Sequence, residues 1–81
     1  MKFIVSKQKA INLNNVDDFH ISSGYLKITT GGGLDAREVQ FVYGTNDELT
    51  KLFYAILQFI NDDNKRIFDC DQFIESVQAN R

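Results

Sequence analysis

The chain has no proline, no tryptophan and only one cysteine in its 81 residues. A single cysteine cannot form a disulfide within the chain, so nothing indicates an oxidising compartment. No stretch approaches the roughly 20 apolar residues of a membrane-spanning helix. The apolar run of three residues before Ser6 is also too short for the core of a signal peptide. We therefore expect a cytoplasmic protein with no membrane attachment.

Basic residues are also scarce. Nine Lys and Arg stand against eleven Asp and Glu, which gives a formal net charge of -2. A protein that binds nucleic acid without sequence preference needs an excess of cationic side chains to neutralise phosphates. The composition therefore argues against direct nucleic-acid binding, and the net negative charge is small for a protein that imitates DNA.

Apolar residues are plentiful, at 43% of the chain, and they include seven Phe. This is a globular composition. A chain of this length can bury one modest core but cannot support two. We therefore expect a single domain over residues 1–81.

Apolar residues recur at every second position in the first half of the chain, which is typical of strands. Five strands are predicted, at residues 2–5, 10–13, 19–22, 25–30 and 37–43. Short turns join the first four strands into two hairpins, and Gly24 in the second turn can take positive φ. In the fifth strand, simple alternation places Phe41 and Tyr43 on one face and Val42 on the other.

The apolar period changes to that of a helix after Gly44. Thr45 and Glu48 match a capping box, in which each side chain accepts a bond from the backbone of the other. The predicted helix runs to about Asn61, and its apolar residues form one broad stripe. We assign this stripe to the core: Leu49, Leu52, Phe53, Ile56, Leu57, Phe59 and Ile60.

A second and shorter helix is predicted after Asp69, which can cap it. Cys70 falls in phase with the apolar residues of this helix, so we expect it to be buried. Residues 67–68 form either a short extended link or a sixth strand.

Together these patterns predict an α+β fold: a curved antiparallel meander of about five strands, then a long packing helix and a short C-terminal helix. The order of the elements resembles the pleckstrin-homology-like superfold, in which a terminal helix plugs a bent sheet. A shared fold would carry no function with it.

The opening segment from Lys2 to Val16 contains the series Ile-Asn-Leu-x-Asn-Val at residues 11–16. It resembles the start of small β-meander-plus-helix proteins of low-GC Gram-positive bacteria and their phages or mobile elements. Those proteins open with a strand, a lysine-bearing turn and a segment of this kind. The resemblance implies a bacterial or phage setting and brings no catalytic residues.

Three consecutive glycines, Gly31 to Gly33, raise the question of a phosphate-binding loop. A P-loop needs a lysine directly after its last glycine and a helix behind it, but no lysine follows until Lys51 and the next element is a strand. A dinucleotide fingerprint fails because it would require glycine where Ala36 stands. The glycines therefore indicate a wide loop between two strands, and we expect no cofactor.

Catalytic and metal-binding patterns are equally weak. Cys70 has only one histidine, His20, that could activate it, and alternation places His20 on the polar face of its strand. A calcium loop starting at Asp62 is broken by Arg66 and Ile67. We therefore expect no catalytic residues and no metal site, and a protein that is not an enzyme.

Recognition of a protein partner is the remaining hypothesis. The loop at residues 31–36 carries Leu34 and Asp35, with Arg37 beside it, and loops on rigid scaffolds often hold binding residues. Such a loop is also tolerated without any function, and the sequence leaves both readings open. Tyr25 and Tyr54 are expected outside the core, where tyrosine favours interfaces.

The sequence thus predicts a non-enzymatic protein-interaction module. One version is a small phage or mobile-element protein that binds and inhibits a host protein, similar in size and style to phage inhibitors of CRISPR nucleases. The alternative is a homodimeric structural or adaptor protein. That dimer would bury the sheet face that the helix leaves open, with Ile4, Val42 and Tyr25 as its patch.

Overall fold

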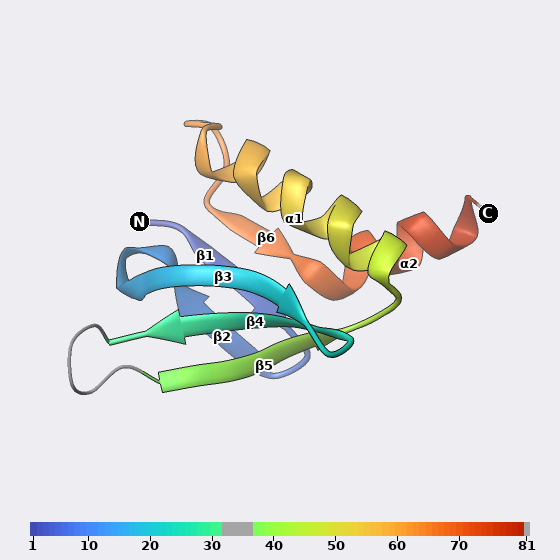
Figure 1. Ribbon diagram of the computed structural model, residues 1–81. Coiled ribbons are helices and arrows are strands. Elements are labelled where there is room, and N and C mark those ends of the chain that lie inside the picture. Colours follow the sequence, from blue (N-terminus) through green and yellow to red (C-terminus); the bar gives the residue numbers. More distant parts are fainter. Residues whose placement is uncertain (32–36, 81) are drawn as a thin grey trace.

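The computed structural model describes residues 1–31 and 37–80 (Figure 1). This part of the chain forms six strands, two α-helices and a short 3-10 helix. In chain order they are β1 (Phe3–Ser6), β2 (Lys9–Asn12), the 3-10 helix η1 (Leu13–Asn15), β3 (Val16–Ser22), β4 (Tyr25–Thr30), β5 (Arg37–Tyr43), α1 (Asn46–Ile60), β6 (Ile67–Asp69) and α2 (Cys70–Ala79). The predicted α+β class and order of elements are confirmed.

The strands are grouped differently from the single meander that the sequence predicts. They form two three-stranded sheets, of order β2-β1-β6 and β3-β4-β5. The break falls at η1, where the Asn12 side chain accepts a hydrogen bond of 2.9 Å from the backbone nitrogen of Asn14. Because this bond turns the chain just after β2, β3 starts a new sheet. β6 is the sixth strand and pairs parallel with β1.

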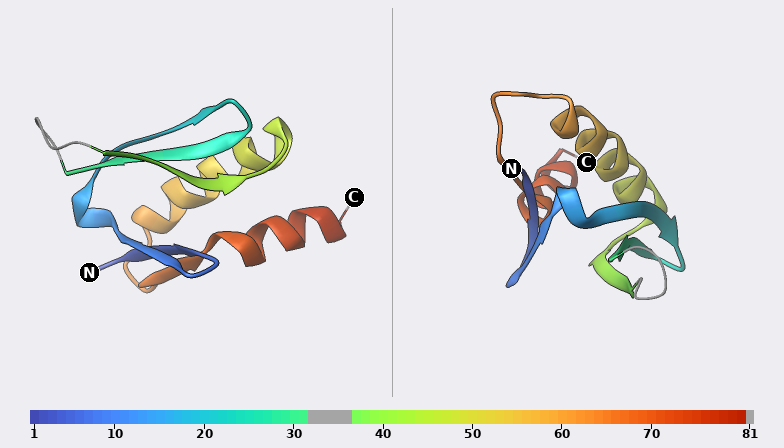
Figure 2. Two further views of the ribbon diagram at one scale, coloured as in Figure 1. Left: turned by 90° about the horizontal axis from the view of Figure 1, so that it is seen from below. Right: turned by 90° about the vertical axis from the view of Figure 1, so that its left-hand side faces the viewer.

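Each sheet has its own helix, and the two helices join the halves of the molecule. Helix α1 packs on β3 and β4, α2 packs on β1, and α1 and α2 pack on each other. Figure 2 shows the two sheets and the two helices from two further directions. The core is therefore shared between the sheets through the helices.

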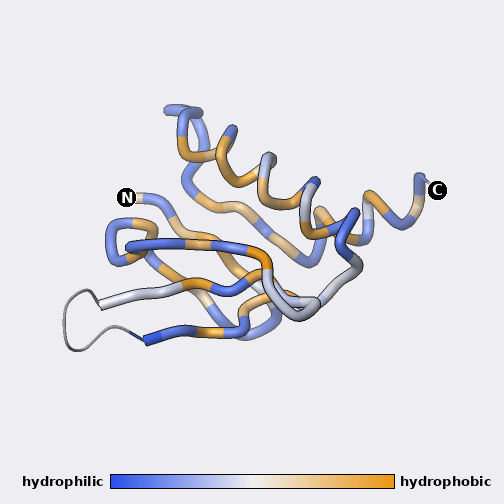
Figure 3. Tube along the Cα trace, in the orientation of Figure 1, coloured by the Kyte–Doolittle hydropathy of each residue, from blue (hydrophilic) through white to orange (hydrophobic). Residues whose placement is uncertain are grey.

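The buried apolar residues come from both sheets and both helices. They are Ile4, Leu26, Ile28, Phe41, Val42, Leu49, Leu52, Ile56, Phe59, Cys70 and Ile74. Figure 3 shows apolar and polar stretches alternating along α1, as expected of a helix with one buried side. The predicted inward direction of Leu26 and Ile28 is confirmed. Ile4 and Val42 are buried, so the prediction that they form an exposed patch for a homodimer is wrong for these two residues.

A β-bulge in β5 explains why Val42 is buried. Leu26 pairs with Val42 and Lys27 pairs with Gln40, so Phe41 is an extra residue in β5. A bulge shifts the alternation of side chains by one position. Phe41 and Val42 are consequently both buried, while Tyr43 is 73% exposed. The simple alternation predicted for this strand is therefore wrong at Val42 and Tyr43.

The capping box at the start of α1 is confirmed. The backbone nitrogen of Thr45 donates to Glu48 Oε1 at 2.9 Å, and that of Glu48 donates to Thr45 Oγ1 at 3.2 Å. Glu48 is only 3% exposed. Its second oxygen, Oε2, accepts a bond of 3.0 Å from Gln78 Nε2 near the end of α2. One buried carboxylate thus starts α1 and also fastens α2 to it.

Helix α2 is anchored at its other end as well. The Asp69 side chain accepts from the backbone nitrogen of Gln72 at 3.0 Å, which confirms the predicted cap. Asp71 accepts from the buried Ser6 hydroxyl at 2.8 Å and from the Lys7 backbone nitrogen at 2.6 Å. These bonds hold the β1–β2 turn against the first turn of α2.

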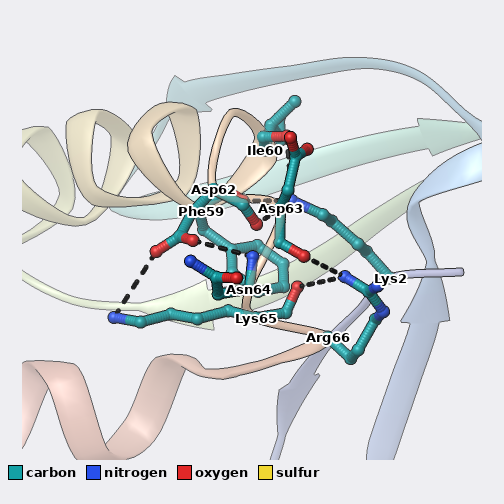
Figure 4. Close-up of polar contacts among 8 residues, drawn as sticks. All are labelled: Lys2, Phe59, Ile60, Asp62, Asp63, Asn64, Lys65 and Arg66. Atoms are coloured by element: carbon teal, nitrogen blue, oxygen red, sulfur yellow. Dashed lines mark hydrogen bonds and ion pairs between the residues drawn. The ribbon is translucent and has the colours of Figure 1, made fainter.

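The end of α1 is closed by a residue from the other end of the chain. Lys2 Nζ donates to the backbone carbonyls of Phe59 at 2.6 Å, Ile60 at 2.9 Å and Asp62 at 2.6 Å (Figure 4). It also lies 5.0 Å from the centre of the Phe59 ring. The last carbonyls of a helix lack partners within the helix and carry its negative dipole end. Since the last turn of α1 has no basic residue, Lys2 supplies that charge.

We predict that Lys2→Met lowers the free energy of unfolding by about 2 kcal/mol, because it removes a charged donor from carbonyls at a helix end. Methionine keeps much of the apolar stem that lies beside Phe59. Urea unfolding followed by circular dichroism measures the change. Lys65→Met is the matched control, because the Lys65 side chain is exposed and, among the described residues, forms an ion pair with Asp62 alone, at 4.0 Å. Equal effects of the two variants would contradict the role given to Lys2.

Candidate functional site

A groove of about 580 Å³ lies between α1 and the segment that leads from η1 into β3. Apolar side chains make up most of its lining, and polar groups lie among them. The lining residues are Met1, Lys2, Leu13, Asn14, Val16, Asp17, Asp18, Phe19, Phe53, Leu57 and Ile60. The groove is thus built by three separate parts of the chain.

The α1 side of the groove consists of apolar residues that the core does not cover. Leu57 is 38% exposed and Ile60 is 39% exposed, whereas Phe59, which lies between them in sequence, is buried. Phe53 is half-buried, and its ring lies 5.1 Å from that of Phe19 on β3. The prediction that the whole apolar stripe of α1 belongs to the core is therefore wrong at Leu57 and Ile60. The stripe is wider than the surface that the strands and α2 offer to it.

The β3 side of the groove carries two successive carboxylates. Val16 pairs with Thr30 and Asp18 pairs with Thr29, so Asp17 is an extra residue in the ladder. This bulge lies on an edge strand, where bulges commonly redirect side chains. Asp17 and Asp18 are both exposed. The bulge thus places two acidic groups in succession along one side of an apolar groove.

The partners of the charged lining residues differ. Asp18 Oδ2 lies 3.0 Å from His20 Nδ1 on the same strand. In the part of the chain that the structure describes, no hydrogen bond or ion pair engages the Asp17 side chain. Lys2 also lines the groove, but its ammonium is held by the three carbonyls at the end of α1. Among the side chains that line the groove, the charges without a partner or at the exposed border are therefore negative.

The partner-binding residues predicted from the sequence do not gather at one place. Tyr54 is 60% exposed, as predicted, and its ring lies 5.6 Å from that of Phe53 beside the groove. Arg37 is exposed at the start of β5. Leu34 and Asp35 lie outside the described residues. Of the described candidates, Tyr54 alone has a ring contact with a residue that lines the groove.

Tyr25 lies elsewhere, on the other face of the β3-β4-β5 sheet. It is half-buried against Tyr43, with the two rings 5.4 Å apart in an edge-to-face arrangement. Because the β5 bulge turns Tyr43 outward, Tyr43 rather than Tyr25 is the exposed member of this pair. The sequence alone does not indicate that Tyr43 is more exposed than Tyr25.

His20 lies on the polar face of β3, as predicted. Its Nδ1 faces Asp18, and its Nε2 lies 3.6 Å from Glu38 Oε2, while Lys27 Nζ lies 3.8 Å from Glu38 Oε1. These groups form a surface network of charges across three strands. Among residues 1–31 and 37–80, no cluster of three or more His, Cys, Asp or Glu is placed to hold a metal ion.

Cys70 is fully buried, as the sequence predicts. Burial raises the pKa of its thiol to about 12, and the negative charges of Asp71 and Asp69 act in the same direction. Because the thiolate is the nucleophilic form of cysteine, Cys70 stays protonated and unreactive at neutral pH. Its environment is that of a core residue.

Comparison of the chain with protein-family models, curated proteins and solved structures gives no match. Neither α-helix in the described chain is long and apolar enough to cross a membrane. A proposal for function must therefore come from the groove and the residues that line it.

We predict that Cys70 reacts with a thiol reagent such as Ellman's reagent only after unfolding. In the native protein the thiol is buried and its raised pKa keeps it protonated at mildly alkaline pH. Absorbance of the released product, with and without guanidinium chloride, measures the reaction. Rapid labelling of the native protein would show that the first turn of α2 becomes accessible to solvent, contrary to the packing described.

Proposed function

We propose that this protein is a non-enzymatic protein-interaction module and that the groove between α1 and β3 is its contact surface. The observation that carries the proposal is the exposure of Leu57 and Ile60 on a helix whose neighbouring apolar residues are buried. Exposed apolar surface rimmed by polar residues is typical of protein-interaction sites. Burying it against a partner would gain about 25 cal/mol for each Å² of apolar area.

The form of the groove favours a protein partner over a small molecule. Its volume of about 580 Å³ lies in the range of ligand pockets. Specific ligand pockets, however, also have polar groups that converge on the ligand. Here the polar groups Asp17 and Asp18 are exposed on the strand side, and Met1 is 73% exposed on another side. A broad apolar contact with charge at its border resembles a protein interface more closely.

The proposal extends to the biological setting. The resemblance of residues 2–16 to small proteins of Gram-positive bacteria and their phages or mobile elements supports action in a bacterial cytoplasm. In that setting a small module without catalytic groups inhibits a host protein by covering a surface that the host protein needs. The homodimer remains the alternative. Since Ile4 and Val42 are in the core, they cannot supply its contact surface, and we propose the groove for it instead.

We predict that Leu57→Glu abolishes capture of the partner while Gln58→Glu does not. Both variants add one negative charge to the same turn of α1, but Gln58 is exposed and does not line the groove. The tagged proteins are used to capture partners from a lysate of the native host, and mass spectrometry compares the yields. We expect at least about a tenfold loss for Leu57→Glu, as for an apolar hot-spot residue.

Circular dichroism and thermal unfolding serve as controls that Leu57→Glu still folds, which its partial exposure favours. Unchanged capture by Leu57→Glu would exclude the groove as the contact surface. A wild-type chain that sediments as a dimer, and a Leu57→Glu variant that sediments as a monomer, would instead establish the homodimer.

A further inference from the structure

We infer that the groove recognises a peptide segment of a partner protein in which apolar residues are accompanied by lysine or arginine. This inference rests on the proposed function and adds the chemistry of the partner. It combines two features that lie on opposite sides of the groove. One is the uncovered apolar part of α1, and the other is the pair of carboxylates on β3.

The apolar side determines that the segment must bring apolar side chains. Phe53, Leu57 and Ile60 follow one another along α1 at spacings of four and three residues, so they lie on the same side of the helix. The ring of Phe19 from β3 packs against the ring of Phe53. A polar segment here would lose its hydrogen bonds to water without replacement.

The strand side determines the charge of the segment. Asp17 and Asp18 follow one another at the bulge, and both are exposed beside the apolar lining. Asp18 already has a neighbour in His20 at 3.0 Å. The Asp17 side chain, within the described chain, has no such neighbour. A lysine or arginine of the partner would therefore meet Asp17 first, with Asp18 adding to the attraction.

The remaining charges near the groove reinforce this selection. The Lys2 ammonium is held by three carbonyls at distances of 2.6 to 2.9 Å, and among the described residues it forms no ion pair with Asp17 or Asp18. Its three donor positions are thus taken up by the helix end, and none is left for an acidic residue of a partner. Charges at the border of an interface mainly set specificity and the rate of association. The groove should therefore discriminate between basic and acidic segments of equal apolar character.

A second copy of this chain fits the groove less well. A two-fold contact through the groove brings the same surface of both copies together. The interface would then contain the Asp17 and Asp18 carboxylates of both copies. Like charges across an interface are unfavourable. A segment of a different protein with apolar and basic residues would complement both the apolar side and the acidic side of the groove.

The test uses a phage-displayed library of random linear peptides, selected on the full chain. We expect enriched peptides to combine apolar residues with Lys or Arg, and their binding to be lost with Leu57→Glu. Fluorescence anisotropy then measures the affinity of one enriched peptide for Asp17→Asn/Asp18→Asn. We expect it to be about fivefold weaker at low salt, with a smaller difference at high salt.

Asp47→Asn/Glu75→Gln is the matched control, because it removes the same amount of charge from exposed positions that do not line the groove. Its affinity for the peptide should equal that of the wild type. Circular dichroism of all variants shows that they remain folded.

The other outcomes separate the two proposals. This inference is overturned if the enriched peptides are apolar but lack basic residues. It is also overturned if they bind Asp17→Asn/Asp18→Asn as tightly as the wild type. In both cases the groove is still an interaction site if Leu57→Glu abolishes binding. No enrichment, or enrichment that is insensitive to Leu57→Glu, overturns the proposed function as well. A dimer that Leu57→Glu dissociates identifies a second copy as the occupant and also overturns the inference.

Discussion

The three hydrogen bonds that the Lys2 ammonium donates at the end of α1 link the start of the chain to that helix and add to the packing that joins the two sheets. Lys2 directly precedes β1, which belongs to one sheet, while α1 packs on the other sheet. The bonds therefore join two halves that share no strand. They satisfy helix carbonyls that have no partner within the helix. They also hold the start of the chain beside Ile60, at one end of the groove (Figure 4).

Helix α1 has to serve two purposes with one set of apolar residues. Leu49, Leu52, Ile56 and Phe59 are buried and join the two sheets. Phe53, Leu57 and Ile60 line the groove. A chain of 81 residues has little further structure with which to cover the second group. This surface is thus exposed because the fold is small and the apolar stripe is wide. Binding of a partner would bury it, which is favourable for apolar surface.

The elements that could be predicted are those set by neighbouring residues. The capping box of Thr45 and Glu48, the cap at Asp69 and the turn at Gly24 each depend on groups within a few positions of one another. The candidate site was predicted far less well. Tyr54 was correctly placed outside the core. The apolar period assigns Leu57 to the core, and the sequence gives Asp17 no role in binding. Periodicity shows which residues share a face, but not which of them other elements cover.

The sequence by itself determined the α+β class, the order of the elements, the limits of α1 and the start of α2, since local hydrogen bonds and apolar periods decide these features. Only the tertiary structure decided the division into two sheets and the parallel pairing of β1 with β6. It also decided the bulges at Asp17 and Phe41, which set where Asp17, Val42 and Tyr43 lie. These features depend on contacts between residues far apart in the chain. Such contacts are selected by the packing of the complete core, which no single segment encodes.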